Sequence, residues 1–427
     1  MRKFLWKIIF CIVGIFIIAG GMVFYRCHFD ENRFFADITD RISTQKKNIL
    51  IITPDATQNG AQIMLLNLAE ILKKHDYNVT VIAYKYSGLL QKKYKKAGIP
   101  LYVWKGSRGL NHYQYADKLK NIMQKFDLLI LNTKDTAYYT IICPQCNYIQ
   151  WVHELSMLQD NRYCQDGKII ELPEYIPTNH LIIVPSELTF CKLPFKEILL
   201  HNNVQIVPYA INDTDILTFD VKKVEKMKQK LGLEGKIVFT ETASIQKRKG
   251  QDIFMQAVKL LPPEYLQKAH FIIQGLNVDD KFYDHLKEEA ANYNNVTLLP
   301  EMPHSEMGNI YALTSVLVLP SRKDPAPLVV AEAAANKIPA VISTMVGTTN
   351  LIQNGRSGFV VPCEDAAALA EKIKYFIDNP DKIKEMGMSA QHLYRQIYIP
   401  EVFEKTWLEL IEQELHGTYA TKDEKIL

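Results

Sequence analysis

The chain has 427 residues, of which 48% are hydrophobic and 23% are charged. This composition is typical of a globular protein, and the length indicates two or three domains rather than one. The 50 basic and 47 acidic side chains leave a net charge of +3, which gives no general bias toward nucleic acid. The seven cysteines are odd in number and scattered, which argues against a disulfide framework and favours a reducing compartment.

The N-terminus predicts a membrane anchor over residues 1–25. Residues 8–25, IIFCIVGIFIIAGGMVFY, carry no charge over about the length that the hydrocarbon core of a bilayer requires. The basic residues before this run also suit a signal peptide, but the run is longer than a usual signal-peptide core and lacks a clear cleavage site. Basic residues on both sides leave the orientation open. We expect one uncleaved transmembrane helix, then a tether over 26–47.

From residue 48 onward, short β-branched runs alternate with amphipathic stretches, which is the pattern of parallel sheets covered by helices. A charged helical stretch separates the runs into two series. The first comprises 48–53, 78–84, 101–104, 127–132, 147–152, 181–185 and 204–208, and the second 236–243, 270–275, 295–300, 315–320, 339–343 and 358–362. We predict two doubly wound α/β domains at 48–210 and 211–399, a helix over 400–416 that could return to the first domain, and a tail over 417–427.

Two such domains predict a ligand in a cleft between them, because open α/β sheets bind at the carboxyl ends of their strands. Four segments follow predicted strands. In the first, TPDATQNGAQIMLL, Gly60 opens a helix whose free N–H groups could hold an anion, although a plain tight turn explains it equally well. The segment is neither G-x-x-x-x-G-K-[ST] nor G-x-G-x-x-G, which argues against an ordinary ATPase or dehydrogenase.

The second and third segments carry a histidine and a basic cluster. In YIQWVHELSM, His153 ends a strand, where it could bind a hydroxyl or exchange a proton; a structural histidine is the simpler interpretation of this segment alone. In TETASIQKRKGQD, three cations lie between a strand and a helix, at Lys247, Arg248 and Lys249. They could neutralise a diphosphate or form a solvated surface cluster.

The fourth segment carries two carboxylates and a glycine turn. SRKDPAPLVVAEAAANKIPAV places Asp324 ahead of a turn and Glu332 on a helix of small apolar residues. Farther on, Gly347 with Thr348 and Thr349 opens another helix, which would offer another set of anion-binding N–H groups.

The order and spacing of these segments resemble the retaining glycosyltransferases of family 4, over about residues 48–416. Asp324 and Glu332 have seven residues between them and match that family's E-x7-E signature, with Asp in the first place. The stretches NGAQIMLLNLAEIL, QWVHEL, VPYAIN, KRKGQD, PLVVAEAAANKIPAVIST and NGRSGFVVP match as well. The resemblance implies the GT-B fold, in which two Rossmann-like doubly wound domains face a central cleft.

The resemblance also implies a nucleotide-diphosphate sugar as donor, held mainly on the second domain. Glu332 would accept hydrogen bonds from the ribose hydroxyls, and Asp324 would contact the transferred sugar. Lys249, helped by Arg248, would stabilise the diphosphate as negative charge grows on it.

Backbone groups around Gly60 and at 347–349 would complete the diphosphate cradle, and His153 would meet the sugar or the acceptor. In retaining members the acceptor hydroxyl is thought to attack the face that the diphosphate leaves, with a leaving-group oxygen taking its proton. We therefore expect positioning to carry most of the catalysis. We expect no metal, and no cofactor besides the donor substrate.

Two motifs mimic metal sites. DTD at 213–215 imitates a metal-binding D-x-D but follows the predicted domain link rather than a nucleotide-binding strand. CPQC at 143–146 has no second cysteine pair, so neither zinc binding nor redox chemistry is expected there.

Three positions depart from the family pattern. Many members have Gly-Arg at 243–244, where this chain has Ala-Ser, so one cation is missing unless Arg248 or Lys247 replaces it. Asp324 is a methylene shorter than the usual Glu and precedes PAP. Asn350 stands where a second acidic residue is common. These departures bear on the identity of the sugar and on the rate more than on the fold.

Together these features predict a membrane-anchored retaining glycosyltransferase that moves a hexose from a nucleotide sugar to a glycan or lipid-linked acceptor. A cytoplasmic donor would require the catalytic domains to face the cytoplasm. Two alternatives stay open. One is a catalytically weak GT-B protein that serves as a binding scaffold, and the other is a GT-B sugar-nucleotide epimerase, which would need no membrane acceptor.

Overall fold

A computed structural model of the protein describes residues 33–417 except 58, 87, 104–118, 138, 156–161, 166–167, 172–180, 193–202 and 212–213. The anchor expected at 1–25 lies outside these residues, as do the first part of the tether and nearly all of the tail. Within the described part of the chain, no helix is both long enough and apolar enough to cross a membrane. In the predicted tether, residues 33–39 are helical, and Ile38 is buried among apolar side chains of the first sheet.

The first sheet has seven strands in the order β3-β2-β1-β4-β5-β8-β9. The chain starts in the middle at β1, builds one edge through β2 and β3, and returns to build the other, as in doubly wound folds. The pairs β1–β2, β1–β4, β2–β3 and β8–β9 are parallel. The strands are β1 (Asn48–Asp55), β2 (Asn78–Tyr86), β3 (Leu101–Val103), β4 (Leu128–Asn132), β5 (Tyr148–Trp151), β8 (Leu181–Val184) and β9 (Asn203–Ile206).

Short helices accompany this sheet, and its central strand is buried almost throughout, as expected when both faces are covered. The helices are α2 (Gly60–Lys74), α3 (Leu90–Ala97), α5 (Tyr139–Ile142) and α6 (Glu187–Cys191), with the short 3₁₀ helix η1 (Lys134–Thr136). An antiparallel hairpin of β6 (Arg162–Gln165) and β7 (Lys168–Glu171) was not among the predicted strands. Asp-Gly at 166–167 is the turn signal that could have revealed it.

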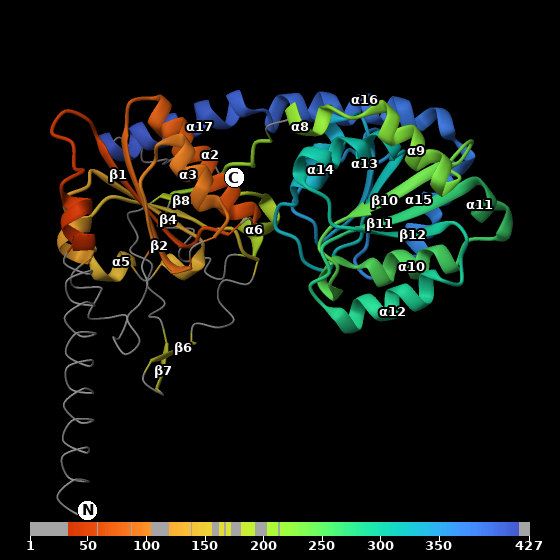
Figure 1. The fold of residues 1–427 in the computed structure, drawn as a ribbon, viewed down its shortest axis with the longest axis horizontal. Helices are drawn as coiled ribbons and strands as arrows, with labels where there is room; N and C mark the ends of the chain where they lie inside the picture. The colour runs from red at the N-terminus through yellow and green to blue at the C-terminus, as the bar shows by residue number, and fades with distance from the viewer. Residues whose placement is uncertain are drawn as a thin grey trace, which may run out of the picture. The chain divides into compact units, whose positions relative to one another are not determined.

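The second sheet has six strands in the order β12-β11-β10-β13-β14-β15, and every neighbouring pair is parallel (Figure 1). Each strand overlaps a predicted run. The strands are β10 (Ile237–Thr242), β11 (Ala269–Gly275), β12 (Val296–Pro300), β13 (Val316–Leu319), β14 (Ala340–Ser343) and β15 (Gly358–Val361). The helices around them are α8 (Thr214–Leu217), α9 (Val221–Leu231), α10 (Gln251–Lys259), α11 (Pro263–Lys268), α12 (Asp280–Ala290), α13 (Met307–Leu313), α14 (Leu328–Ala335), α15 (Ala366–Asp378) and α16 (Pro380–Ile397).

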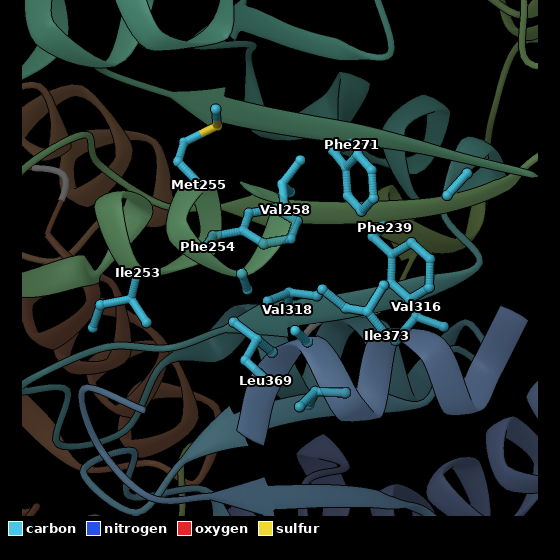
Figure 2. Close-up of a cluster of buried hydrophobic side chains, with 14 of the residues drawn as sticks. Phe239, Ile253, Phe254, Met255, Val258, Phe271, Val316, Val318, Leu369 and Ile373 are labelled. Carbon is cyan, nitrogen blue, oxygen red and sulfur yellow. The ribbon is translucent and has the colours of Figure 1, made fainter. Parts of the chain in front are cut away.

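Helices pack on both faces of the second sheet. On one face, α10, α12 and α15 bury an aromatic cluster in which Phe239 stacks on Phe271 with ring centroids 5.7 Å apart, and Phe254 meets Phe271 edge-on (Figure 2). On the other face, α13, α14 and α16 pack against Leu317 and Leu319. Helices therefore close both faces of this sheet.

Contacts divide the described residues into two compact units. One extends to Gln150 and includes the last residues from Gln413, and the other contains the described residues between Trp151 and Glu412. The second unit includes the second sheet, β8 and β9, and most of α17 (Pro400–His416). In that unit, Phe403 and Trp407 of α17 pack against the ring of Trp151. The predicted domain limits at 210 and 399 stay predictions.

Candidate functional site

A short loop, residues 243–246, separates the basic segment from the end of β10. Lys247–Lys249 form the 3₁₀ helix η2, and Gly250, at φ +84°, links η2 to α10. A Cβ on Gly250 would lie 2.3 Å from the carbonyl oxygen of Pro320, which follows β13. A glycine is therefore needed here both for its backbone conformation and for space. It lets the basic segment lie directly against the segment that carries Asp324.

The structure brings Lys249 and Asp324 together as a buried ion pair. The Lys249 ammonium donates to Oδ2 of Asp324, and the two side chains are 12% and 7% exposed. Each charge compensates for the desolvation of the other, and removing either one would leave its partner buried and unpaired. An anionic group that reached Lys249 would compete with Asp324 for the ammonium.

The turn after β14 holds Asp324 by its backbone. The N–H of Asp324 donates to the carbonyl of Met345 (3.0 Å), and the N–H of Gly347 donates to the carbonyl of Asp324 (2.8 Å). A Cβ on Gly347 would lie 1.6 Å from the carbonyl oxygen of Pro325, so only glycine allows this approach. The N–H of Gly347 is already bonded to the carbonyl of Asp324. The contribution of this glycine is therefore to let the turn pack closely against the segment that carries Asp324.

The rest of that turn differs from the expected helix. Thr349–Leu351 form a three-residue 3₁₀ helix, η4, so the expected set of free helical N–H groups is reduced. Thr348 is 1% exposed, and its hydroxyl has no hydrogen-bond partner in the described part of the chain. The hydroxyl of Thr348 is thus a buried polar group that the described residues leave unsatisfied.

Glu332 lies on α14 and is held by two side chains that the sequence analysis missed. Nε2 of His304 lies 3.2 Å from Oε1, and the hydroxyl of Tyr311 donates to Oε2. Burial, together with the charge of Glu332, raises the pKa of Tyr311, so its hydroxyl stays a donor at neutral pH. The carboxylate is therefore fixed by both contacts. The side chain of His304 is 53% exposed, whereas that of Glu332 is 5% exposed.

A signal for His304 was present in the sequence, because it follows the predicted strand at 295–300 and so stands at the edge where ligands bind. Tyr311 gave no such signal. It lies within α13 and faces the core from there.

Arg322 fastens the basic segment to the segment that carries Asp324, and sequence reasoning missed it too. Its guanidinium binds both carboxylate oxygens of Asp252 at 2.8 and 2.9 Å, Oε1 of Glu364 at 2.7 Å and the carbonyl of Lys247 at 2.6 Å. The bond to Asp252 is the first cause of a raised pKa of Arg322. A two-pronged contact of this kind fixes geometry as well as charge.

Backbone bonds continue the same connection. The N–H of Arg322 donates to the carbonyl of Arg248 (2.8 Å), and the hydroxyl of Ser321 donates to the carbonyl of Lys249 (3.2 Å). Nη1 of Arg248 in turn donates to the carbonyl of Lys323 (3.2 Å). Arg248 thus braces the neighbouring segment.

We expect Arg322→Lys to lower the free energy of unfolding by about 1–3 kcal/mol, because the lysine keeps the charge but cannot make the paired bonds to Asp252. Urea denaturation measures this change. Glu364→Gln is the matched control: its side chain is 64% exposed, and the effect should stay within about 0.5 kcal/mol. Equal changes in the free energy of unfolding for the two variants would show that the contact between Arg322 and Asp252 does not stabilise the fold.

His153 is buried beside Trp151, with ring centroids 4.7 Å apart, and its Nδ1 hydrogen-bonds to the hydroxyl of Tyr209. Burial lowers the pKa of His153 to about 3. The imidazole is therefore neutral at pH 7, which suits hydrogen bonding to a hydroxyl rather than proton exchange near neutral pH. The charges of Glu154 and Asp324 add to the effect of burial in raising the pKa of Tyr209, which places the His153–Tyr209 pair within electrostatic range of Asp324.

For the remaining positions singled out in the sequence, the structure gives local surroundings but no test of a role in binding. Gly60 begins α2 in the first unit, with open space around it, and its role toward residues of the second unit stays a prediction. Ser244, where many family members have arginine, accepts a bond from the Gln246 amide at 2.6 Å. Asn350 accepts one from the hydroxyl of Tyr398 at 2.8 Å. Ser244 and Asn350, two of the residues that depart from the family pattern, thus each hydrogen-bond to a neighbouring side chain.

Glu241, near the end of β10, is an unexpected buried acid. It is fully buried, and neither carboxylate oxygen has a hydrogen-bond partner among the residues described. Burial raises its pKa well above the usual value, although the charge of Lys249 opposes the shift. The folded protein therefore holds a proton on Glu241 more readily than the unfolded chain does.

Glu241→Gln should stabilise the protein increasingly as the pH rises. Below about pH 4 the wild-type glutamate is protonated in both the folded and the unfolded state, so the variant should gain little. Above that, the folded state holds a proton that the unfolded state has released, and wild-type stability falls by up to about 1.4 kcal/mol per pH unit until the folded pKa is reached. Urea denaturation between pH 5 and 8 measures the difference. A difference that stays constant with pH would contradict this account of Glu241.

A metal centre finds no support in the described part of the chain, where no three His, Cys, Asp or Glu side chains lie close enough to share an ion. The DTD motif begins at residue 213, outside the described residues. The expectation of a metal-free site stays a prediction.

Comparison with known proteins finds a similarity to one family in the second half of the chain. Residues 223–393 match the family model described as glycosyl transferases group 1. The chain is 28% identical over 178 residues to D-inositol 3-phosphate glycosyltransferase 1 of Catenulispora acidiphila, covering 39% of this chain and 43% of that protein. It is 24% identical over 247 residues to alpha-galactosylglucosyldiacylglycerol synthase of Streptococcus pneumoniae, covering 56% and 62%. The matches thus span less than two thirds of these relatives.

Solved structures extend the likeness of fold to both sheets. Anabaena Alr3699/HepE in complex with UDP and glucose has a TM-score of 0.69 at 17% identity, covering 85% of this chain and 99% of that one. Sucrose-phosphate synthase from Thermosynechococcus elongatus has a TM-score of 0.68 at 18% identity, covering 87% and 100%. The two parallel-sheet α/β units match the fold of GT-B glycosyltransferases, and residues 223–393 are similar to the glycosyl transferases group 1 family.

Proposed function

We propose that the protein is a membrane-anchored retaining glycosyltransferase that moves a sugar from a nucleotide-diphosphate sugar to a glycan or lipid-linked acceptor. One observation carries the proposal. At the strand ends of the second sheet, the buried Lys249–Asp324 pair lies in the same unit as Glu332, whose carboxylate is oriented by His304 and Tyr311. A cation for a diphosphate and a fixed carboxylate for a diol are the groups that a nucleotide-sugar site needs.

The donor would be bound in two places. Glu332 accepts hydrogen bonds from the ribose hydroxyls, while Lys249 and the hydroxyl of Thr348 meet the diphosphate. Solved structures with this fold include complexes with UDP and with UDP-glucose, which supports a nucleotide-sugar donor. No metal and no further cofactor enters the proposal.

Transfer would proceed with retention at the anomeric carbon. The acceptor oxygen forms its bond to that carbon on the face from which the diphosphate leaves, and a leaving-group oxygen takes the acceptor proton. Lys249 stabilises the negative charge that develops on the diphosphate, and Asp324 contacts the sugar. Neutral His153 donates to or accepts from a hydroxyl of the sugar or acceptor, because its lowered pKa rules out a role as imidazolium at pH 7.

The N-terminal sequence supports the proposal of a membrane-bound acceptor. Residues 8–25 are uncharged over about the length of a bilayer core and would hold the enzyme at a membrane surface. Two relatives carry names that concern a glycolipid and an envelope polymer: alpha-galactosylglucosyldiacylglycerol synthase and the Staphylococcus aureus capsular polysaccharide biosynthesis glycosyltransferase CapM. We place the catalytic part in the cytoplasm, where a nucleotide sugar is available.

A second candidate function is a binding scaffold with little turnover, favoured by Ala243-Ser244, where many family members have Gly-Arg.

The proposed transferase function is tested by a transfer assay on the full-length protein in detergent, with radiolabelled UDP-, GDP- and ADP-sugars and a membrane lipid extract. The proposal predicts that one sugar enters the lipid or polymer fraction with its anomeric configuration retained. Binding of a nucleotide without transfer would favour the scaffold, and sugar interconversion without an acceptor would favour an epimerase.

A further inference from the structure

The CPQC motif forms a closed turn between α5 and β5, in the first unit. The N–H of Cys146 donates to the carbonyl of Cys143 at 3.1 Å, which closes a four-residue turn. Pro144 stands at the second position, where its fixed φ favours a β-turn. The turn brings the two sulfur atoms to 2.6 Å, only about half an ångström beyond the 2.05 Å of a covalent S–S bond.

The pair is buried on one side and reachable on the other. Cys143 is fully buried, whereas Cys146 is 8% exposed and lines a hollow of about 360 Å³ with Asp127, Asn147 and Leu415 among its other walls. An ion pair between Lys47 and Asp127, 3.2 Å long, lies in the same wall. Of the two cysteines, Cys146 is therefore the one that a small disulfide reagent would meet on entering this hollow.

We propose that Cys143 and Cys146 form a reversible intramolecular disulfide when the protein meets a disulfide oxidant such as glutathione disulfide. The thiolate of Cys146 attacks one sulfur of glutathione disulfide, forms a mixed disulfide and releases one glutathione thiolate. The thiolate of Cys143 then attacks the Cys146 sulfur, forms the Cys143–Cys146 bond and releases the second glutathione. Two protein thiols are oxidised, and one glutathione disulfide is reduced to two glutathione thiols.

This proposal replaces the expectation that CPQC has no redox role. That expectation rested on the missing second cysteine pair, which is what zinc would need, and the described residues offer no third ligand for a metal here. A disulfide needs two sulfurs alone. The cross-link would join the end of α5 to the start of β5, and it depends in no way on the proposed transferase activity.

The surroundings of the two cysteines determine how fast the disulfide forms. Burial, together with neighbouring Cys143, raises the pKa of Cys146 to about 12, while a bond with Tyr148 opposes the shift. The other titratable groups near the pair are Tyr139 on α5, which is also buried, and the Lys47–Asp127 ion pair in the wall of the hollow. Since thiolate is scarce at pH 7, oxidation should be slow and should accelerate by about tenfold per pH unit between pH 7 and 9.

The test is thiol mapping on the reduced full-length protein in detergent. After incubation with glutathione disulfide at pH 8.5, remaining thiols are alkylated and the protein is digested with trypsin, which leaves both cysteines on one peptide, residues 135–162. We expect that peptide to lose two hydrogens, to escape alkylation and to recover both thiols with dithiothreitol. Cys143→Ser should instead leave glutathione on Cys146.

A matched control is the double variant Cys191→Ser, Cys363→Ser, which removes two other free thiols and should form the same linked peptide at the same rate. Full alkylation of Cys143 and Cys146 in the wild-type protein after prolonged oxidation would overturn the proposal. A wild-type peptide that carries glutathione on Cys146 beside a free Cys143 would overturn it as well.

Discussion

Lys249→Ala is expected to lower turnover about a hundredfold or more, with a much smaller effect on donor affinity. Removing one preorganised group that stabilises developing negative charge costs roughly that much in other enzymes. Lys249 is suited to the role because it is largely buried, follows β10 and is held in place by Asp324. Steady-state kinetics with the donor that the transfer assay identifies separate kcat from KM.

The matched control is Lys247→Ala. Lys247 lies two residues away on the same short helix, its side chain is exposed, and its carbonyl, which the substitution keeps, accepts the bond from Arg322. Its turnover should stay close to wild type. Because Lys249→Ala leaves Asp324 buried and unpaired, circular dichroism must show that this variant is folded, and Lys249→Arg, which keeps the charge, should recover part of the rate. Wild-type turnover in folded Lys249→Ala would remove Lys249 from the mechanism.

Glu332→Ala is expected to weaken nucleotide binding by about a hundredfold or more. A hydrogen bond to a charged group contributes about 1.5–3 kcal/mol, and a carboxylate that binds a vicinal diol accepts two such bonds. Two bonds at the lower limit correspond to a factor of about a hundred in Kd. The carboxylate is already oriented by Tyr311 and His304, so little ordering is left to be done on binding.

The control for Glu332 is a nucleotide without the ribose hydroxyls. Wild-type protein should bind the 2′,3′-dideoxy nucleoside diphosphate about as weakly as Glu332→Ala binds the normal one, and the variant should hardly distinguish the two ligands. Tyr311→Phe removes the donor to Oε2 but leaves the carboxylate, and it should cost part of the affinity. If Glu332→Ala lost as much affinity for the dideoxy nucleotide as for the normal one, the residue would act on structure and not on the diol.

The sheets could be predicted because parallel strands are short, β-branched and separated by amphipathic helices. The runs at 236–243 and 315–320 correspond to β10 and β13. Lys249 and Asp324 lie in the loops that follow these two strands. Since the carboxyl ends of neighbouring parallel strands meet at one edge, the juxtaposition of these two side chains follows from their positions in the sequence.

Contacts between side chains on distant segments could not be predicted. Arg322, in the stretch SRKDP, looks like an exposed loop cation, and Asp252 gives no hint that it lies opposite, 70 residues away. In the sequence, Tyr311 looks like any core-facing residue of a helix. Only the fold shows that its hydroxyl donates to Glu332. Gly347 was expected to offer a free N–H, and only the fold shows that this group is bonded to Asp324.

The charge state of His153 was also beyond the sequence. A histidine at the end of a strand suggests proton exchange near pH 7, but full burial beside Trp151 and Tyr209 lowers its pKa to about 3. Burial depends on the whole fold, and a local motif does not report it.

The central claim is that residues of the second unit bind a nucleotide. Isothermal titration of UDP, GDP and ADP into the full-length protein in detergent, with Glu332→Ala in parallel, tests it most directly. The account predicts that the wild-type protein binds one of the three and that the variant loses about a hundredfold or more of that affinity. A folded wild-type protein that binds none of them, or a variant that binds as tightly as wild type, would contradict it.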